Sequence, residues 1–295
     1  MMNYLLEIKN LVKKYKQVVA VDGISFSVTE GTCFGLIGPN GAGKTTTIEV
    51  IEDIIPPTSG EILYKGKPRS SSFKQEVGIQ FQQTALLSSL TIRETLKIFK
   101  SLYNKSADIE EIIDICNLRE IQKRINDKIS GGQKQRLMLA LAMINKPELM
   151  FLDEPSTGLD PQARRNLWSI IHKIKEKGKT IILTTHYMEE AQRICDEIAI
   201  MDNGKIIAQG TPNQLIKKYC EEITIILPKD SIGFSMEQIP FRYLEINDKI
   251  EIKTSDINSC LNILISKCTD LTELVVRSPN LENVYLNLTG KRLRD

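Results

Sequence analysis

The chain has 295 residues, which is enough for two ordinary domains, and 41% of them are hydrophobic. Its 39 basic residues nearly balance its 37 acidic ones, so the overall charge argues against a nucleic-acid partner. No apolar run reaches the about 18 residues that a membrane-spanning helix requires, and charges interrupt the apolar N-terminus where a signal peptide would lie. Any membrane role is therefore expected to be peripheral.

Six cysteines occur at positions 33, 116, 195, 220, 260 and 268, and none of them forms a Cys-x-x-Cys pair. This usage predicts free thiols in a reduced cytoplasmic protein, with neither a disulfide framework nor a zinc site.

The first predicted elements are two strands, over residues 5–12 and 24–28, whose alternating pattern is typical of an antiparallel sheet. Tyr15 lies in the connection between them. From the residues alone, packing of this tyrosine on the sheet is favoured over stacking on a ligand.

A glycine-rich loop follows. The apolar residues 33–37 predict a buried strand, and residues 46–51 predict the start of a helix. Glycines between them let successive backbone N–H groups point into one concavity, and the helix start adds a partial positive charge. A lysine there suits the outer phosphates of a nucleoside triphosphate, and a hydroxyl suits Mg²⁺. The predicted phosphate-binding residues are Gly38, Pro39, Asn40, Gly41, Ala42, Gly43, Lys44, Thr45 and Thr46.

After short strands at residues 61–64 and 77–81, the pattern becomes helical over about residues 84–145. Thr91 with Glu94 predicts a capping box, which begins a helix with Ile92, Leu96, Phe99 and Tyr103 at helical spacing. Asp108 predicts the start of the next helix. The region is expected to be a helical insertion in a frame rich in strands.

A second candidate anion site closes this insertion. Ser130 stands where a helix N-cap belongs, and Gly131, Gly132 and Gln133 open the helix to close approach. A plain serine cap with a flexible turn is the alternative when the motif is taken alone.

Two further strands are expected to end in polar residues at the same sheet edge as the loop. Residues 149–153 are apolar and end at Asp153 and Glu154, a carboxylate pair suited to Mg²⁺ and to polarising an attacking water. Asp160 with Pro161 predicts a helix start. Residues 180–185 form the second strand, and His186 stands just beyond it, where an imidazole can hydrogen-bond a terminal phosphate.

Beyond a predicted hairpin at residues 196–208, the composition shifts at about residue 220. Alternating segments at 222–227, 249–253 and 271–276 predict strands, and Asp256 and residues 281–288 predict helices. Residues 221–295 are therefore expected to form a small α+β accessory domain that packs or regulates, and residues 1–220 an α/β nucleotide-binding domain with a helical subdomain.

Across about residues 3–220, the order of these motifs resembles the nucleotide-binding subunit of ATP-binding cassette (ABC) transporters, a P-loop NTPase. Ile129 departs from the leucine that usually begins the family's signature, and Ser130 to Gln133 keep the rest of it. Gln80, Gln82 and Gln83 compete for the family's glutamine position; the preceding phenylalanine favours Gln82, with Gln83 as the fallback.

The resemblance implies an ATPase that uses ATP and Mg²⁺. It implies that Glu154 activates water and that His186 and Gln82 orient the γ-phosphate and water. It also implies that Tyr15 stacks on adenine, which reverses the preference, from the residues alone, for packing of this tyrosine on the sheet. Thr45, Gln82 and Asp153 are implied as the metal site. Asp160 and the residues Ser130, Gly131, Gly132 and Gln133 are implied to bind nucleotide as well.

One triphosphate cannot lie on two separate helix N-termini of one globule, so we expect a head-to-tail homodimer, or pseudo-dimer, with two composite sites. Residues 278–291 resemble the end of bacterial drug and antibiotic exporter ATPases, which implies a separate membrane permease and a location on the inner face of the cell membrane. Residues 84–103 are expected to face that permease, although internal packing of Ala85, Leu86 and Leu87 is an equal alternative. The competing function is a soluble ABC-type ATPase in translation, DNA maintenance or assembly.

Overall fold

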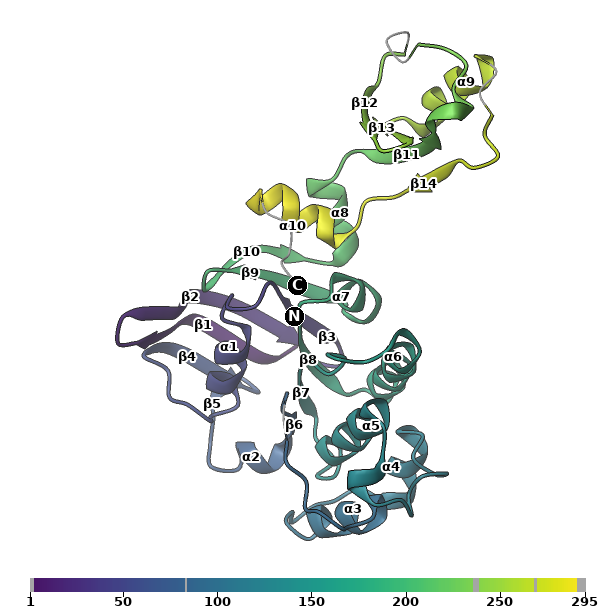
Figure 1. The fold of residues 1–295 in the computed structure, drawn as a ribbon. Helices are drawn as coiled ribbons and strands as arrows, with labels where there is room; N and C mark the ends of the chain where they lie inside the picture. The colour runs from purple at the N-terminus through teal and green to yellow at the C-terminus, as the bar shows by residue number, and fades with distance from the viewer. Residues whose placement is uncertain (1–2, 83, 236–238, 268–269, 291–295) are drawn as a thin grey trace. The chain divides into compact units, whose positions relative to one another are not determined.

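The computed structural model describes residues 3–82, 84–235, 239–267 and 270–290 (Figure 1). The chain divides into two compact units between Pro212 and Asn213, and each unit is described separately.

The first unit begins with an antiparallel sheet in the order β2 (Val18–Thr29), β1 (Tyr4–Tyr15), β4 (Ser59–Tyr64) and β5 (Lys67–Pro68). β1 and β2 form the predicted antiparallel pair, and both are longer than predicted. Leu6 and Ile8 of β1 are buried at alternate positions, and a bulge between Ile8 and Leu11 puts Leu11 in the core as well.

A six-stranded sheet lies at the centre of this unit, in the order β10 (Lys205–Gly210), β9 (Glu197–Asp202), β3 (Cys33–Ile37), β8 (Thr180–Thr185), β7 (Leu149–Asp153) and β6 (Val77–Gln80). β10 pairs antiparallel with β9, and the other neighbours are parallel. Every residue of β3, β7 and β8 is buried, which explains why their sequences are apolar runs without alternation.

Helices α1 (Lys44–Ile51), α6 (Pro161–Glu176) and α7 (Met188–Ile194) follow β3, β7 and β8. The register of the parallel strands pairs Ile37 of β3 with Thr185 of β8, and Thr184 of β8 with Asp153 of β7. The carboxyl ends of these three strands therefore lie level with one another, and the loops that leave them meet at one edge of the sheet.

The predicted helical insertion contains α3 (Ile92–Lys100), α4 (Ile109–Ile115), the short η1 (Asn126–Lys128) and α5 (Gly131–Ala142); α2 (Phe73–Glu76) precedes β6. Thr91 and Glu94 form the predicted capping box, and Asp108 caps α4. Tyr103 was expected within the first of these helices, but α3 ends at Lys100. In Figure 1, α3, α4 and α5 lie apart from β1 and β2.

α5 packs against β6, α3 and α6. The contact with β6 is very close, because a Cβ atom on Gly78 would stand 1.9 Å from the carbonyl oxygen of Ala142 at the end of α5. Only glycine fits there. The carboxyl end of α5 therefore rests directly on the backbone of β6.

The second unit has a four-stranded antiparallel sheet in the order β12 (Arg242–Ile246), β13 (Lys249–Thr254), β11 (Ile223–Pro228) and β14 (Val275–Arg277). α9 (Ile257–Ser266), capped by Asp256, packs on one face with a core that includes Ile225, Ile252 and Leu264. The unit also contains α8 (Pro212–Tyr219), η2 (Lys229–Ser231) and α10 (Leu281–Thr289).

The sequence predicts a small α+β domain over residues 221–295, whereas this unit begins at Asn213 and so includes most of α8. Two of its strands also differ from the prediction. β12 was not predicted, because its side chains are largely exposed and give no core-facing pattern. The strand predicted at residues 271–276 is shorter and shifted to Val275–Arg277, because residues 272–273 form a turn.

Within the described part of the chain, none of the helices has the length and apolar character needed to cross a bilayer. Cys33, Cys116, Cys195, Cys220 and Cys260 are free thiols, as predicted, and Cys268 lies outside the described residues.

Candidate active site

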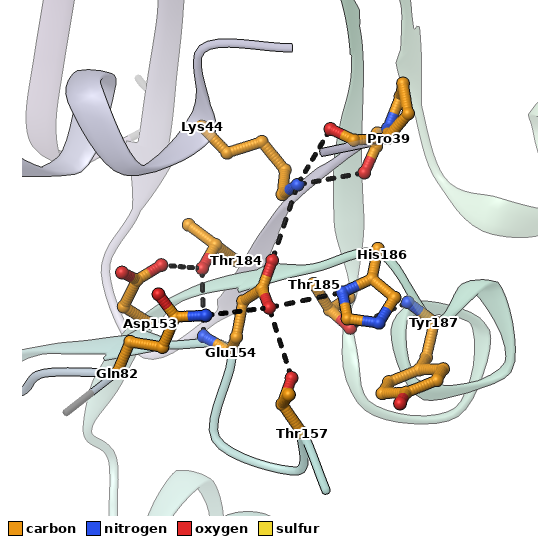
Figure 2. A network of polar contacts seen from close by, with 11 residues as sticks. Pro39, Lys44, Gln82, Asp153, Glu154, Thr157, Thr184, Thr185, His186 and Tyr187 are labelled. Atoms are coloured by element: carbon orange, nitrogen blue, oxygen red, sulfur yellow. Dashed lines mark hydrogen bonds and ion pairs between the residues drawn. The ribbon is translucent and has the colours of Figure 1, made fainter. Parts of the chain in front are cut away.

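The glycine-rich loop joins β3 to α1 and holds Lys44 in a buried position. Gly43 is the N-cap of α1 and has a φ of 99°, and a Cβ atom there would stand 2.3 Å from the carbonyl oxygen of Ala20. The Lys44 amine donates to the carbonyl oxygens of Gly38 at 2.9 Å and Pro39 at 3.1 Å (Figure 2). Burial lowers the pKa of Lys44, and the nearby Glu154 carboxylate offsets part of that effect.

Glu154 is the centre of the polar network in Figure 2. It is 7% exposed, and its backbone has a φ of 46°, a left-handed conformation that is uncommon for residues other than glycine. Its backbone N–H donates to the Thr184 carbonyl at 3.1 Å and to the Thr184 hydroxyl at 3.0 Å, which fixes the turn at the end of β7. This conformation aims the carboxylate toward the glycine-rich loop.

Four side chains from four segments reach that carboxylate. Its Oε1 lies 3.5 Å from the Lys44 amine. Its Oε2 accepts from the Gln82 amide at 3.4 Å and from the Thr157 hydroxyl at 3.1 Å. His186 Nδ1 is 3.2 Å from the same Oε2, although the angles do not make this contact a hydrogen bond. The structure thus brings together the predicted residues Lys44, Gln82, Glu154 and His186.

Asp153 lies beside this network, at the last position of β7. It is 7% exposed, and the hydroxyl of Thr184 donates to its Oδ1. Burial raises the pKa of Asp153, whereas the hydrogen bond from Thr184, the charge of Lys44 and a hydrogen bond from Thr45 lower it. Thr45 and Asp153, two of the residues predicted to hold a metal, are thus near each other.

These oxygen donors fit Mg²⁺, which takes one or two protein ligands and completes its shell with phosphate and water. Among the described residues, no group of three or more His, Cys, Asp and Glu side chains could form a metal centre of their own.

The three candidate glutamines have different positions. Gln80 is buried at the end of β6, and its amide donates to Gln135 of α5 at 2.8 Å. Gln82, which the sequence favoured, is the one that reaches Glu154. The fallback, Gln83, lies outside the described residues.

The second predicted anion site stands apart from the first. Ser130 caps α5 and forms a capping box with Gln133, and both Ser130 and Gly131 are exposed. α5 packs on β6, α3 and α6, whereas α1 packs on β2 and β7. The structure therefore does not bring Ser130, Gly131, Gly132 and Gln133 to the glycine-rich loop of the same chain.

Asp160 caps α6, and its Oδ1 accepts from the backbone N–H groups of Gln162 and Ala163. A Cβ atom on Gly132 would stand 2.9 Å from the Cβ atom of Ala163. The first turns of α5 and α6 are therefore adjacent, so Asp160 belongs to the same surface as Ser130.

Tyr15 is 44% exposed at the end of β1, where its ring lies 5.0 Å from the Lys13 amine. The β1–β2 hairpin that carries it also supplies Ala20, whose carbonyl oxygen closely approaches Gly43. The ring is accessible on a segment that touches the glycine-rich loop.

Two site residues escaped the sequence analysis. Thr184 was treated only as part of a strand, yet its hydroxyl joins Asp153 to the backbone of Glu154. Thr157, three residues after Glu154, was not singled out. These contacts follow from the register between β7 and β8 and from the turn after β7, which the sequence does not show. A polar residue near the end of a buried strand, such as Thr184, is nevertheless a signal that could mark a site residue.

A buried parallel sheet, a glycine-rich loop that opens a helix, and an adjacent Asp-Glu pair define a P-loop nucleotide-binding domain. Comparison with known proteins refines this class. A family model described as "ABC transporter" matches residues 21–157. The chain is 35% identical to the linearmycin resistance ATP-binding protein LnrL of Bacillus subtilis (strain 168), over 99% of this chain and 100% of that one. It is 37% identical to the Nod factor export ATP-binding protein I of Burkholderia pseudomallei (strain K96243), over 98% of each chain.

Solved structures give the same result for the first unit. The cbiO1 protein of Clostridium perfringens, part of the ABC transporter complex cbiONQ, aligns with a TM-score of 0.68 and 25% identity over 73% of this chain and 92% of that one. An ATP-binding subunit of another ABC transporter aligns with a TM-score of 0.65 and 30% identity, over 73% and 93%. The chain belongs to the ABC transporter family: it is an ATPase, and an ATP-binding subunit of the exporter type.

Proposed function

We propose that two copies of this chain bind ATP between them, with Lys44 of one copy and Ser130 of the other at each site, and that hydrolysis drives export through a separate permease. The observation that carries the chemical half of this proposal is the convergence of Lys44, Gln82 and His186 on the carboxylate of Glu154. The dimeric half is supported by the exposure of Ser130 and Gly131 on a different part of the unit.

Magnesium ATP, when bound, supplies the triphosphate and a cation that offsets developing negative charge. The backbone N–H groups of residues 40–46 would hold the phosphates, and Lys44 would exchange its contacts with the carbonyls of Gly38 and Pro39 for the outer phosphates. Thr45, Gln82 and Asp153 would hold the metal. Tyr15 stacks on the adenine.

Glu154 orients the attacking water and accepts its proton. Its carboxylate is held by the turn that Thr184 fixes, so little reorganisation is needed. His186 and Gln82 flank the same carboxylate oxygen and orient the γ-phosphate and the water. Ser130, Gly131, Gly132 and Gln133, with Asp160 nearby, bind the γ-phosphate held by the other copy.

The permease is proposed to contact residues 84–103, which follow Gln82 directly. Leu87, Ile98 and Leu102 are exposed there, so an apolar surface is available for a partner. The subunit would then lie on the cytoplasmic face of the membrane, held by its permease. Relatives named for linearmycin resistance and for Nod factor export support export as the direction of transport, with a drug, antibiotic, peptide or lipid as the proposed cargo.

The test is a nucleotide-trapped dimer. Glu154→Gln keeps the shape of the side chain but removes the base, so we expect ATP binding, hydrolysis slowed at least 100-fold, and dimers in ATP by light scattering. Adding Ser130→Arg to Glu154→Gln should leave ATP bound to monomers, because the arginine blocks only the partner's site. A double variant that loses ATP binding itself, or a Glu154→Gln protein that stays monomeric with its permease present, contradicts the composite site.

A further inference from the structure

The second unit carries a hollow of about 640 Å³, which is a volume typical of sites for small organic ligands. Its floor is the face of the four-stranded sheet opposite α9, and its wall includes Leu286 and Asn287 of α10 and Tyr219 at the end of α8. The Asn287 amide donates to the Tyr219 carbonyl at 2.8 Å, which joins the two parts of that wall. The exporter-like motif at residues 278–286 begins at this hollow.

Three cations line up across its floor. Register pairs Arg242 of β12 with Lys253 of β13, Lys253 with Thr224 of β11, and Thr224 with Arg277 of β14. All three basic side chains are exposed. Like charges directly opposite one another on neighbouring strands destabilise a sheet, so the Arg242–Lys253 pair costs stability in the absence of an anion.

The neighbouring row on the same face is mostly apolar. Leu244 of β12 and Val275 of β14 are about half exposed, Ile226 of β11 is buried, and Ile246 lies one row further along β12. Leu244 and Ile246 line the hollow, so apolar and cationic side chains lie side by side on its floor. A ligand that matches both has an anionic head and an apolar body.

The hollow also contains acidic groups, namely Glu251 in the apolar row and Glu221 and Glu222 after α8. Within the part of the chain that the structure describes, none of them forms an ion pair with Arg242, Lys253 or Arg277. The row of cations is therefore not neutralised internally, and its charge is available to a ligand.

We propose that this hollow binds a dissolved amphipathic organic acid, with its anionic head on Arg242, Lys253 and Arg277 and its apolar body over Leu244 and Ile246. A walled hollow favours a single molecule over a flat membrane surface. The site stands on the second unit alone and does not depend on how ATP is hydrolysed.

The test uses octanoate, with 1-octanol as the uncharged match, titrated into the full-length protein by calorimetry. Octanoate is expected to bind the wild type, and Lys253→Gln and Arg277→Gln are each expected to weaken it at least 10-fold. Lys249→Gln is the control, because Lys249 lies on the same strand and face as Lys253 but outside the hollow. Lys253→Gln should unfold at the same temperature as the wild type or higher, since a like-charge pair is removed.

Unchanged octanoate affinity in either Lys253→Gln or Arg277→Gln overturns the proposal, as does equal affinity for 1-octanol. Inorganic phosphate that binds as tightly as octanoate would show that the apolar row contributes nothing. Binding of vesicles with 30% phosphatidylglycerol, in the absence of octanoate binding, would make the site a membrane contact and would also contradict the proposal.

Discussion

Glu52 is a buried acid that the proposed chemistry does not use. It is 2% exposed at the end of α1, and its Oε1 has no hydrogen-bond partner. Burial, helped by the nearby charges of Asp153 and Glu49, raises its pKa to about 8 from the 4.5 that an unperturbed glutamate has. The folded protein therefore binds this proton more tightly than the unfolded chain does.

The raised pKa of Glu52 makes the free energy of unfolding depend on pH. Between pH 4.5 and about 8 the folded state holds more protons, so the free energy of unfolding falls as the pH rises through that window and levels off above it. Glu52→Gln removes this loss. We expect the variant to match the wild type near pH 4.5 and to exceed it near pH 8.5 by at most about 5 kcal/mol, at about 1.4 kcal/mol per pKa unit.

Urea denaturation at pH 5, 6.5 and 8.5 measures this difference. Glu61→Gln is the matched control, because Glu61 is an exposed residue of β4. Its free energy of unfolding should differ from that of the wild type by the same amount at all three pH values. A constant gap between Glu52→Gln and the wild type across the three pH values would place the charge of Glu52 in contact with water.

At the scale of elements, α6 and α7 are joined by a buried hydrogen bond. The indole N–H of Trp168 donates to Glu190 Oε1 at 2.9 Å, and Glu190 is fully buried. The link matters for the site because Asp160 caps α6 and α7 begins two residues after His186. Burial raises the pKa of Glu190, and the hydrogen bond from Trp168 opposes that rise.

Trp168→Phe removes the donor while keeping an aromatic ring. We expect it to lower the free energy of unfolding by about 1–3 kcal/mol, because a buried acceptor loses its partner. Glu190→Gln keeps an acceptor and removes a charge, so it should cost less. A double-mutant cycle read by urea denaturation isolates the pair from the change in packing, and a coupling energy near zero would refute the link.

The same scale shows what the sequence can predict. β3, β7 and β8 were found because both faces are buried, and α3, α4, α5 and α6 because Thr91, Asp108, Ser130 and Asp160 cap them. α7 was missed: Tyr187 caps it without a side-chain hydrogen bond, so no local signal marks its start. β12 was missed because a largely exposed strand carries no apolar periodicity.

The site residues likewise divide into those that a sequence motif predicts and those whose contacts depend on the fold. Lys44, Asp153 and Glu154 follow from motifs, because the chemistry requires those residue types at those positions. The contacts of Gln82 and Thr184 with the Asp-Glu pair depend on strand register and loop path, which pairing between distant segments decides. The sequence offers three candidates for the glutamine and favours Gln82 because a phenylalanine precedes it, and the path of the chain after β6 brings Gln82 to Glu154.

At the scale of the whole molecule, each unit has a hydrophobic core of its own. The first is built on β1, β2 and β3, and the second on β11, β13 and α9. We therefore expect a chain ending at residue 220, the proposed domain boundary, to fold and to bind ATP. Circular dichroism melting and a fluorescent ATP analogue would measure this. A truncated chain that is unfolded or does not bind nucleotide would show that the second unit is needed to complete the first.

The close packing of α5 on β6 links the surface around Ser130 to the strand that leads to Gln82. Ala142 at the carboxyl end of α5 contacts Gly78, Gln135 accepts a hydrogen bond from Gln80, and Ser130 caps the amino end. In a dimer, a nucleotide of the other copy that moved Ser130 would also move α5 and the strand β6 on which this helix packs. Gln82 lies two residues after Gln80, so the Glu154 site of each copy would respond to the nucleotide that the other copy has bound.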